Sequence, residues 1–206
     1  AEEKRELAPQ LYDLTTLQRE ASSQLGFSAE RTLKTAQSLY EKRKLITYPR
    51  TASRYLSHAM GGSVEKALKN LPESYAALSA PVLAGPIPRI KRVFDDTKLT
   101  DHHAIIPTEQ AADLARFSLE EKRIYLMVVK RFLACFYPPY EYRRTRAELL
   151  AEGERFYAAG RTVLQQGWRK VQDSRDEDEA DEQAVPLFHR GDVYTGGLAQ
   201  CKALKT

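Results

Sequence analysis

The chain has 206 residues, enough for one or two domains with a buried core. Hydrophobic residues make up 42% and charged residues 29%, which excludes a disordered or membrane-embedded composition and is ordinary for a globular protein. The formal net charge is only +4, but seven carboxylates crowd into 173–182, so the remainder is more basic than the total indicates. This charge is compatible with a polyanionic partner without identifying one.

Cysteine usage and targeting signals indicate the cellular compartment in which the protein works. Cys135 and Cys201 lie far apart without a CxxC or a neighbouring histidine pattern, which argues against structural zinc. There is no signal peptide and no apolar run long enough to cross a membrane. We therefore expect free thiols in a reducing bacterial cytoplasm and no membrane partner.

The first part of the chain predicts helices. Thr15 or Thr16 is expected to cap a first helix that stops at Gly26, and Ser28 is expected to cap a second one. A strand-like stretch follows at 45–47. A short helix, a turn, a longer helix and a strand are consistent with a winged-helix-like layout.

The middle of the chain predicts further short elements. We expect helix to continue over 54–60, a separate amphipathic helix over 63–71, and an irregular loop over 80–88 because of its prolines. The basic stretch 89–98 is strand-like. The clearest helix of the chain is predicted over 119–136.

The composition changes near Pro138. Segments 140–150, 154–165 and 167–171 alternate and carry Tyr, Thr and Val, a pattern typical of hairpin strands, and 185–193 resumes it. The sequence therefore predicts a mainly helical unit followed by a β-rich unit.

One stretch carries a candidate for phosphate chemistry. Pro49 biases Tyr48 towards an extended backbone, in which Tyr48 and Arg50 face the same side. Thr51 or Ser53 is expected to cap a helix whose positive end lies near Arg50. A phenol, a fixed cation and helix-end N–H groups together suit a phosphate.

Three segments, in order, resemble one known family. Residues 46–56 (Ile-Thr-Tyr-Pro-Arg-Thr-Ala-Ser-Arg-Tyr-Leu) resemble the active-site tyrosine motif of type IA DNA topoisomerases, particularly their topoisomerase III branch. Residues 11–21 are similar to the segment that leads into the family's tyrosine-bearing domain. Residues 99–108 are similar to its histidine motif. The resemblance is specific to about Thr108 and looser beyond it.

The resemblance implies a fold and a division into domains. It implies an α+β multidomain fragment in which a mainly helical, winged-helix-like tyrosine domain, 14–138, is inserted in a β-rich arch domain. The arch would then comprise the lead-in 1–13 and an incomplete segment, 139–206. Because the chain starts without Met and ends abruptly at Lys205-Thr206, we expect a central piece of a longer polypeptide.

The resemblance also implies a reaction. Tyr48 would cleave one DNA strand through a transient 5′-phosphotyrosine, a second strand would pass, and the first would be resealed without ATP. Only about one phenol in a thousand is ionised at pH 7, so negative charge must be stabilised, and Arg50 is the expected cation. His102 takes the place of the active-site histidine, as a phosphate or sugar contact.

Partners and cofactors follow from the same comparison. Single-stranded DNA is the expected substrate, and the expected DNA contacts are Lys44, Thr51, Ser53, Arg54 and Lys98. The family's Mg²⁺ is held by acidic residues of a Toprim domain, which is missing here together with the remaining domains. We therefore expect no metal site in this chain and no activity from it alone. Ala52 stands where family members commonly carry an acidic residue, which puts fine positioning or metal dependence in doubt.

Rival interpretations remain open at this point. Without the resemblance, Tyr48 would be an ordinary strand-end tyrosine among 11 in the chain. A tyrosine recombinase or type IB enzyme would form the opposite, 3′-linked phosphotyrosine. A non-enzymatic, winged-helix-like DNA-binding module would bind strands without forming any covalent link.

Overall fold

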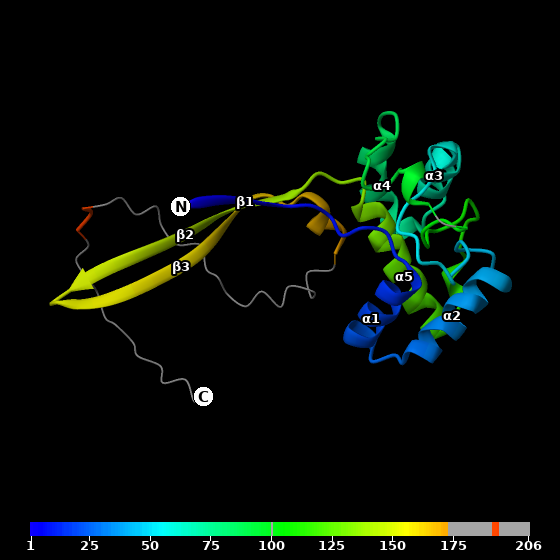
Figure 1. Ribbon diagram of the computed structural model, residues 1–206, viewed down its shortest axis with the longest axis horizontal. Helices are drawn as coiled ribbons and strands as arrows, with labels where there is room; N and C mark the ends of the chain where they lie inside the picture. Colours follow the sequence, from blue (N-terminus) through cyan, green and yellow to red (C-terminus); the bar gives the residue numbers. More distant parts are fainter. Residues whose placement is uncertain (100, 173–190, 194–206) are drawn as a thin grey trace.

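The computed structural model describes residues 1–99, 101–172 and 191–193, and it shows a helical body joined to a long arm of strands (Figure 1). The helices are α1 (Leu14–Leu25), α2 (Ala29–Glu41), α3 (Gly61–Lys69), α4 (Ala76–Leu83) and α5 (Leu119–Ala134), and the strands are β1 (Glu2–Glu6), β2 (Tyr140–Ala151) and β3 (Glu154–Gln165). The predicted mixture of helices and strands is thus observed. Within the described residues, no helix has the length and apolar character needed to cross a membrane.

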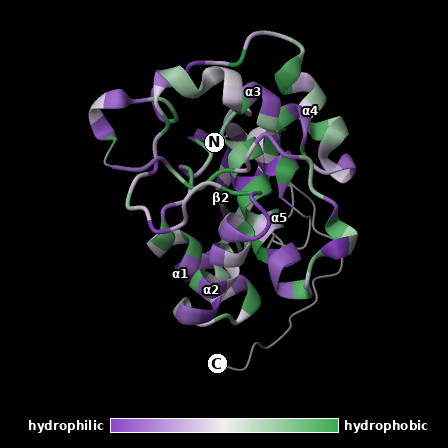
Figure 2. Cartoon of the chain, turned by 90° about the vertical axis from the view of Figure 1, so that its right-hand side faces the viewer, coloured by the Kyte–Doolittle hydropathy of each residue, from purple (hydrophilic) through white to green (hydrophobic). Residues whose placement is uncertain are grey.

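Helix α5 forms the centre of the helical body. Its capping box is complete, because the Ser118 hydroxyl accepts from the Glu121 amide and the Glu121 carboxylate accepts from the Ser118 amide. Ile124, Val128 and Phe132, spaced by four residues, are fully buried on the face that packs towards the rest of the body. The predicted helix is confirmed and ends slightly early, at Ala134. In Figure 2, α1, α2 and α5 each show hydrophilic and hydrophobic faces.

The first two helices have clear ends. Asp13, rather than Thr15 or Thr16, is the N-cap of α1, because its carboxylate accepts from the Thr16 amide at 2.6 Å. Gly26, at φ 67°, ends α1 as predicted. The Ser28 hydroxyl caps α2, also as predicted.

The predicted helix over 54–60 is wrong. Residues 51–57 are irregular, and the Leu56 amide donates to the Val93 carbonyl while the Leu56 carbonyl accepts from the Asp95 amide. These long-range backbone bonds take the place of local helical ones. Helical structure begins only with a 3₁₀ turn at 58–60, which leads into α3.

Three further expectations are corrected. Helix α4 covers the first residues of the predicted loop 80–88, including Pro81. The irregular stretch therefore begins only at residue 84 and continues to residue 90. The stretch 89–98 is not a strand but a turn followed by a 3₁₀ helix, with one isolated bridge at Phe94. The stretch 167–171 is also a 3₁₀ helix, because Gly167, at φ 49°, turns the chain beside Pro139.

The arm is an antiparallel sheet with strand order β1-β2-β3. The predicted hairpin is confirmed: β2 and β3 pair along their length and turn at Glu152 and Gly153, both with positive φ. Strand β1 covers only the root of β2, from Glu6 opposite Tyr140 to Glu2 opposite Arg144. Residues 7–139 therefore form one long insertion between β1 and β2, which are neighbours in the sheet. The acidic run 173–182 and residues 185–190 of the predicted segment 185–193 lie outside the described residues, and residues 191–193 are not in a strand.

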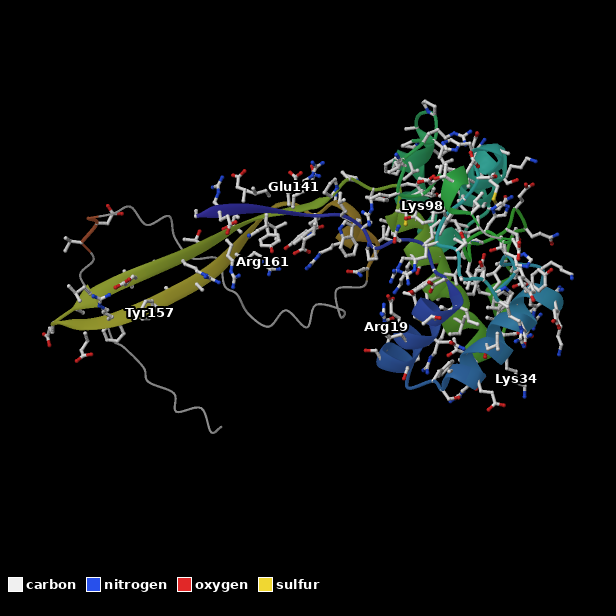
Figure 3. The ribbon with its side chains drawn as sticks, viewed as in Figure 1. Arg19, Lys34, Lys98, Glu141, Tyr157 and Arg161 are labelled. Carbon is white, nitrogen blue, oxygen red and sulfur yellow. The ribbon has the colours of Figure 1, made fainter. Side chains whose placement is uncertain are left out.

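The outer part of the arm carries exposed apolar side chains. Leu150, Phe156 and Tyr157 are largely exposed there, and Tyr157 projects near the tip in Figure 3. At the root, the Trp168 indole donates to the Glu6 carbonyl at 3.0 Å. The arm is thus held by this hydrogen bond at its root, whereas the apolar side chains of its outer part are exposed to solvent.

Candidate active site

The tyrosine motif and the histidine motif lie side by side. Ile46 and Pro107 form an antiparallel bridge, and the Thr47 amide donates to the Ile106 carbonyl at 3.0 Å. The segment preceding Tyr48 is therefore held directly against the segment following the two histidines. Thr100, at the start of the histidine motif, is outside the described residues.

This pairing brings Tyr48 and His102 together. Their ring centroids are 4.4 Å apart, with the rings inclined at 46°. Tyr40, from α2, packs edge-on against Tyr48 at 5.4 Å. Tyr48 is half-buried and His102 is exposed, so the arrangement is open on one side. His103 is half-buried, and its Nδ1 has no hydrogen-bond partner among the described residues.

Arg50 is exposed and anchored to α2. With the Gln37 amide oxygen facing the guanidinium, Gln37 accepts from Arg50 Nε at 3.1 Å and from Nη2 at 3.0 Å. Gln37 and Tyr40 are three residues apart, so one face of α2 supports both Arg50 and Tyr48. Neither residue was predicted to belong to the site, although their helical spacing beside the tyrosine motif was a usable signal.

A largely buried network of Tyr12, Glu20 and Arg131 is hydrogen-bonded to the histidine motif. The Ile105 amide donates to the Tyr12 carbonyl at 2.8 Å, and the Tyr12 hydroxyl donates to the Glu20 carboxylate at 2.6 Å. Arg131, from α5, pairs with Glu20 and lies over the Tyr12 ring at 4.2 Å. Burial, reinforced by the Glu20 carboxylate, raises the pKa of Tyr12, so this phenol remains a donor.

Thr51 and Ser53 shape the bend after Arg50. Their exposed fractions are 6% and 3%. The Thr51 hydroxyl accepts from the Ser53 amide at 3.0 Å, and the Ser53 hydroxyl accepts from the Tyr55 amide at 3.2 Å. No helix starts here, so the predicted helix cap is wrong. Both hydroxyls therefore accept hydrogen bonds from backbone amides and do not face solvent.

The three predicted cationic contacts differ in their surroundings. The Lys44 ammonium lies 5.5 Å from the Tyr40 ring, beside the tyrosine site. Lys98, labelled in Figure 3, donates to the Tyr55 hydroxyl at 3.3 Å. Hydrogen bonds from Gln10 and then from Lys98 lower the pKa of Tyr55. Arg54 is paired with Asp13 at 2.7 Å.

Asp13 connects two parts of the site, because it both caps α1 and pairs with Arg54. Burial acts to raise the pKa of its carboxyl, but the hydrogen bonds from Thr16 and Arg54 outweigh burial and leave the pKa below its usual 3.8. A group whose pKa is lowered on folding stabilises the fold above its unfolded pKa. That contribution is lost as the pH falls through the folded pKa.

We expect Asp13→Ala to lower the free energy of unfolding by about 1–2 kcal/mol at pH 7. The difference from the wild type should begin to shrink as the pH falls below about 3.8, the ordinary pKa of the carboxyl, and should be lost as the pH passes through the lower pKa of the folded protein. Urea unfolding of both proteins at pH 7 and pH 3 measures it. Asp13→Asn, which keeps a capping oxygen, should lose less at pH 7. A difference for Asp13→Ala that does not change with pH would contradict this assignment.

Two cavities are lined mainly by other residues. An apolar cavity of about 410 Å³ lies where the body meets the arm, lined in part by Leu7, Phe136 and Pro138. A polar groove of about 670 Å³ lies between α2 and the start of α5. Tyr48, Arg50 and His102 line neither cavity, although Gln37, which bonds to Arg50, lines the polar groove.

Comparisons with known proteins identify the relatives of this chain. A family model described as DNA topoisomerase matches residues 1–206. "DNA topoisomerase 3" of Bacillus cereus (strain ZK / E33L) is 43% identical over 199 residues, which cover 94% of this chain and 27% of that protein. "DNA topoisomerase 3" of Bacillus subtilis (strain 168) is 42% identical over 195 residues, which cover 92% and 27%.

A solved structure shares the fold. Full-length topoisomerase I from Thermotoga maritima matches with a TM-score of 0.63 and 24% identity, covering 93% of this chain and 30% of that one. The chain spans about a quarter of the length of the curated relatives it matches.

Proposed function

This chain belongs to the type IA DNA topoisomerase family, with topoisomerase 3 proteins among its relatives, and from that premise we propose that Tyr48 is the nucleophile of strand cleavage. The observation that carries the proposal is the contact between the Tyr48 and His102 rings, with Arg50 two residues further along. The parent protein would cleave one DNA strand, allow another to pass, and reseal the first.

The chemistry is a reversible transesterification. The Tyr48 phenol oxygen attacks the phosphorus and loses its proton, the bond from phosphorus to the 3′ oxygen breaks, and that oxygen takes up a proton. The phosphate stays on Tyr48 as a 5′-phosphotyrosine, so resealing by the 3′ hydroxyl needs no ATP. Arg50 supplies a permanent cation for the charged phosphate oxygens, and His102 contacts the phosphate or the sugar.

Mg²⁺ is not assigned to this chain. Among the described residues, no group of three or more His, Cys, Asp or Glu side chains is arranged to hold a metal ion, so these residues do not fit Mg²⁺. In the full-length protein we place Mg²⁺ in a Toprim domain outside this chain. Toprim and the remaining domains of the same polypeptide would complete the site, and this chain alone would be inactive.

The division into domains belongs to the same proposal. Residues 14–138 would form a winged-helix-like tyrosine domain inserted in a β-rich arch, to which 1–13 and 139–206 belong. The pairing of β1 with β2 supports this division, because it places the two ends of the helical body at one sheet. Single-stranded DNA is the proposed substrate. The Bacillus relatives support action in a bacterial cytoplasm.

The polarity of the covalent link tests the proposed reaction. The full-length parent is incubated with Mg²⁺ and single-stranded oligonucleotides labelled at either end, then denatured. We expect label on the protein only from the 3′ end, which is the signature of a 5′-phosphotyrosine, and we expect the adduct to map to Tyr48. Retention of the 5′ label would indicate a type IB or recombinase-like enzyme instead. DNA binding without any adduct would indicate a non-enzymatic binding module.

A further inference from the structure

The contact between Tyr48 and His102 depends on how two irregular segments are held together. The Thr47 hydroxyl donates to the Ala104 carbonyl at 2.7 Å and accepts from the Ile106 amide at 3.0 Å. The Thr47 amide adds a bond to the Ile106 carbonyl at 3.0 Å. We call these three bonds the Thr47 bridge.

The Thr47 hydroxyl takes the place of a backbone acceptor where this pairing ends. Backbone bonds from the Thr47 amide to the Ile106 carbonyl and from the Thr108 amide to the Leu45 carbonyl flank the Ile46–Pro107 bridge. The Ile106 amide, however, donates to the Thr47 hydroxyl and not to a backbone carbonyl, so the backbone ladder goes no further. Among the described residues, Tyr48 makes no backbone-to-backbone hydrogen bond. The Thr47 bridge is therefore the last connection before the tyrosine. A hydroxyl that both donates and accepts to fixed backbone groups has little rotational freedom left.

We infer that Thr47 is a positioning residue whose hydroxyl sets the separation of Tyr48 and His102 and thereby the geometry of attack. This inference rests on the proposed function. Thr47 directly precedes Tyr48, and Ala104 lies two residues after His102, so little intervening chain can absorb a displacement. Reaction rates are sensitive to such shifts: a misplacement of about 1 Å can cost about 100-fold. Thr47 acts through Tyr48 rather than on the DNA.

The test replaces the hydroxyl with a methyl group of similar size. In the full-length parent, Thr47→Val should slow single-turnover adduct formation about tenfold or more, because the two hydroxyl bonds of the bridge are lost while its backbone bond and the phenol remain. Affinity for the oligonucleotide should be unchanged. Thr47→Ser, which keeps the hydroxyl, should restore most of the rate but not all of it, because it lacks the methyl group that restricts the side-chain torsion.

The chain offers a matched control. The Thr108 hydroxyl donates to the Lys44 carbonyl at 2.7 Å, joining the same two segments four residues before Tyr48. Thr108→Val should therefore lower the melting temperature to a similar extent as Thr47→Val but leave the rate of adduct formation unchanged. An equal rate loss in both variants would overturn the inference, because it would show a general loss of structure.

A double-mutant cycle separates positioning from stability. If Thr47 acts through the geometry of Tyr48 and His102, Thr47→Val should have little further effect in a His102→Ala background. Rate losses that multiply would overturn the inference.

If Thr47→Val does not fold at the assay temperature, the smaller loss in Thr47→Ser carries the same test and should likewise vanish beside His102→Ala. A wild-type protein that forms no adduct would overturn the proposed function together with this inference. A wild-type protein that forms one, at a rate matched by Thr47→Val, would overturn the inference alone.

Discussion

Tyr48→Phe is expected to abolish adduct formation and DNA relaxation by the full-length parent. The substitution removes the only atom of Tyr48 that can bond to phosphorus, and deletion of a covalent nucleophile costs roughly four to six orders of magnitude. Binding of single-stranded DNA should survive, because the ring and its packing against Tyr40 and His102 are retained. Gel detection of the adduct, with a parallel binding titration, measures both quantities.

Tyr40→Phe is the matched control for that experiment. It removes a neighbouring phenol hydroxyl from the same aromatic group but leaves Tyr48 and its contact with His102 in place. We expect adduct formation to continue at a rate close to that of the wild type. An adduct that persists in Tyr48→Phe would refute Tyr48 as the nucleophile, and loss of the adduct in both variants would indicate disruption of the site.

Arg131→Met should be the most destabilising substitution considered for the helical body. The side chains of Arg131 and Glu20 are only 11% and 23% exposed, so removing the cation leaves a largely buried carboxylate without its counterion, held by the Tyr12 hydroxyl. Breaking a buried ion pair in this way costs about 3–5 kcal/mol, which corresponds to a melting temperature lower by about 10 °C or more. Thermal unfolding followed by circular dichroism measures the shift.

Two further variants test this explanation. Arg31→Met breaks the pair with Glu120, whose two side chains are 50% and 42% exposed, and should change the melting temperature little. Combining Arg131→Met with Glu20→Gln removes both charges and should recover part of the loss. A large shift for Arg31→Met, or no recovery in the double variant, would rule out the buried charge as the cause.

Local patterns in the sequence predicted the elements that local interactions determine. Helix α5 follows from apolar residues at helical spacing, and the hairpin of β2 and β3 follows from alternation around Gly153. The predicted helix over 54–60 failed because Leu56 pairs with Val93 and Asp95, and no local pattern encodes such distant backbone partners. Asp13 was missed as a cap because two threonines beside it are also good capping residues.

The candidate site was only partly predictable for the same reason. The sequence predicted that Tyr48 and Arg50 share a side of one extended segment, but the chain bends at residues 49 and 50. The approach of His102 is a tertiary contact, which the sequence suggested only through resemblance to a family. The Thr47 bridge and the bond between Gln37 and Arg50 join segments whose pairing becomes visible only in the folded chain.

The placement of β1 has a consequence for the order of folding. Strand β1 pairs with β2 across a loop that contains all of 7–139, and closing so long a loop costs roughly 4 kcal/mol of chain entropy. The helical body reduces that cost once it has folded, because the Cys135 thiol and the Arg131 guanidinium hold the carbonyls of Pro9 and Gln10 close to the end of α5. The hairpin of β2 and β3, closed by a two-residue turn, needs no such help. Strand β1 is therefore expected to join the sheet last, and substitutions that loosen the body will delay completion of an arm that they do not touch.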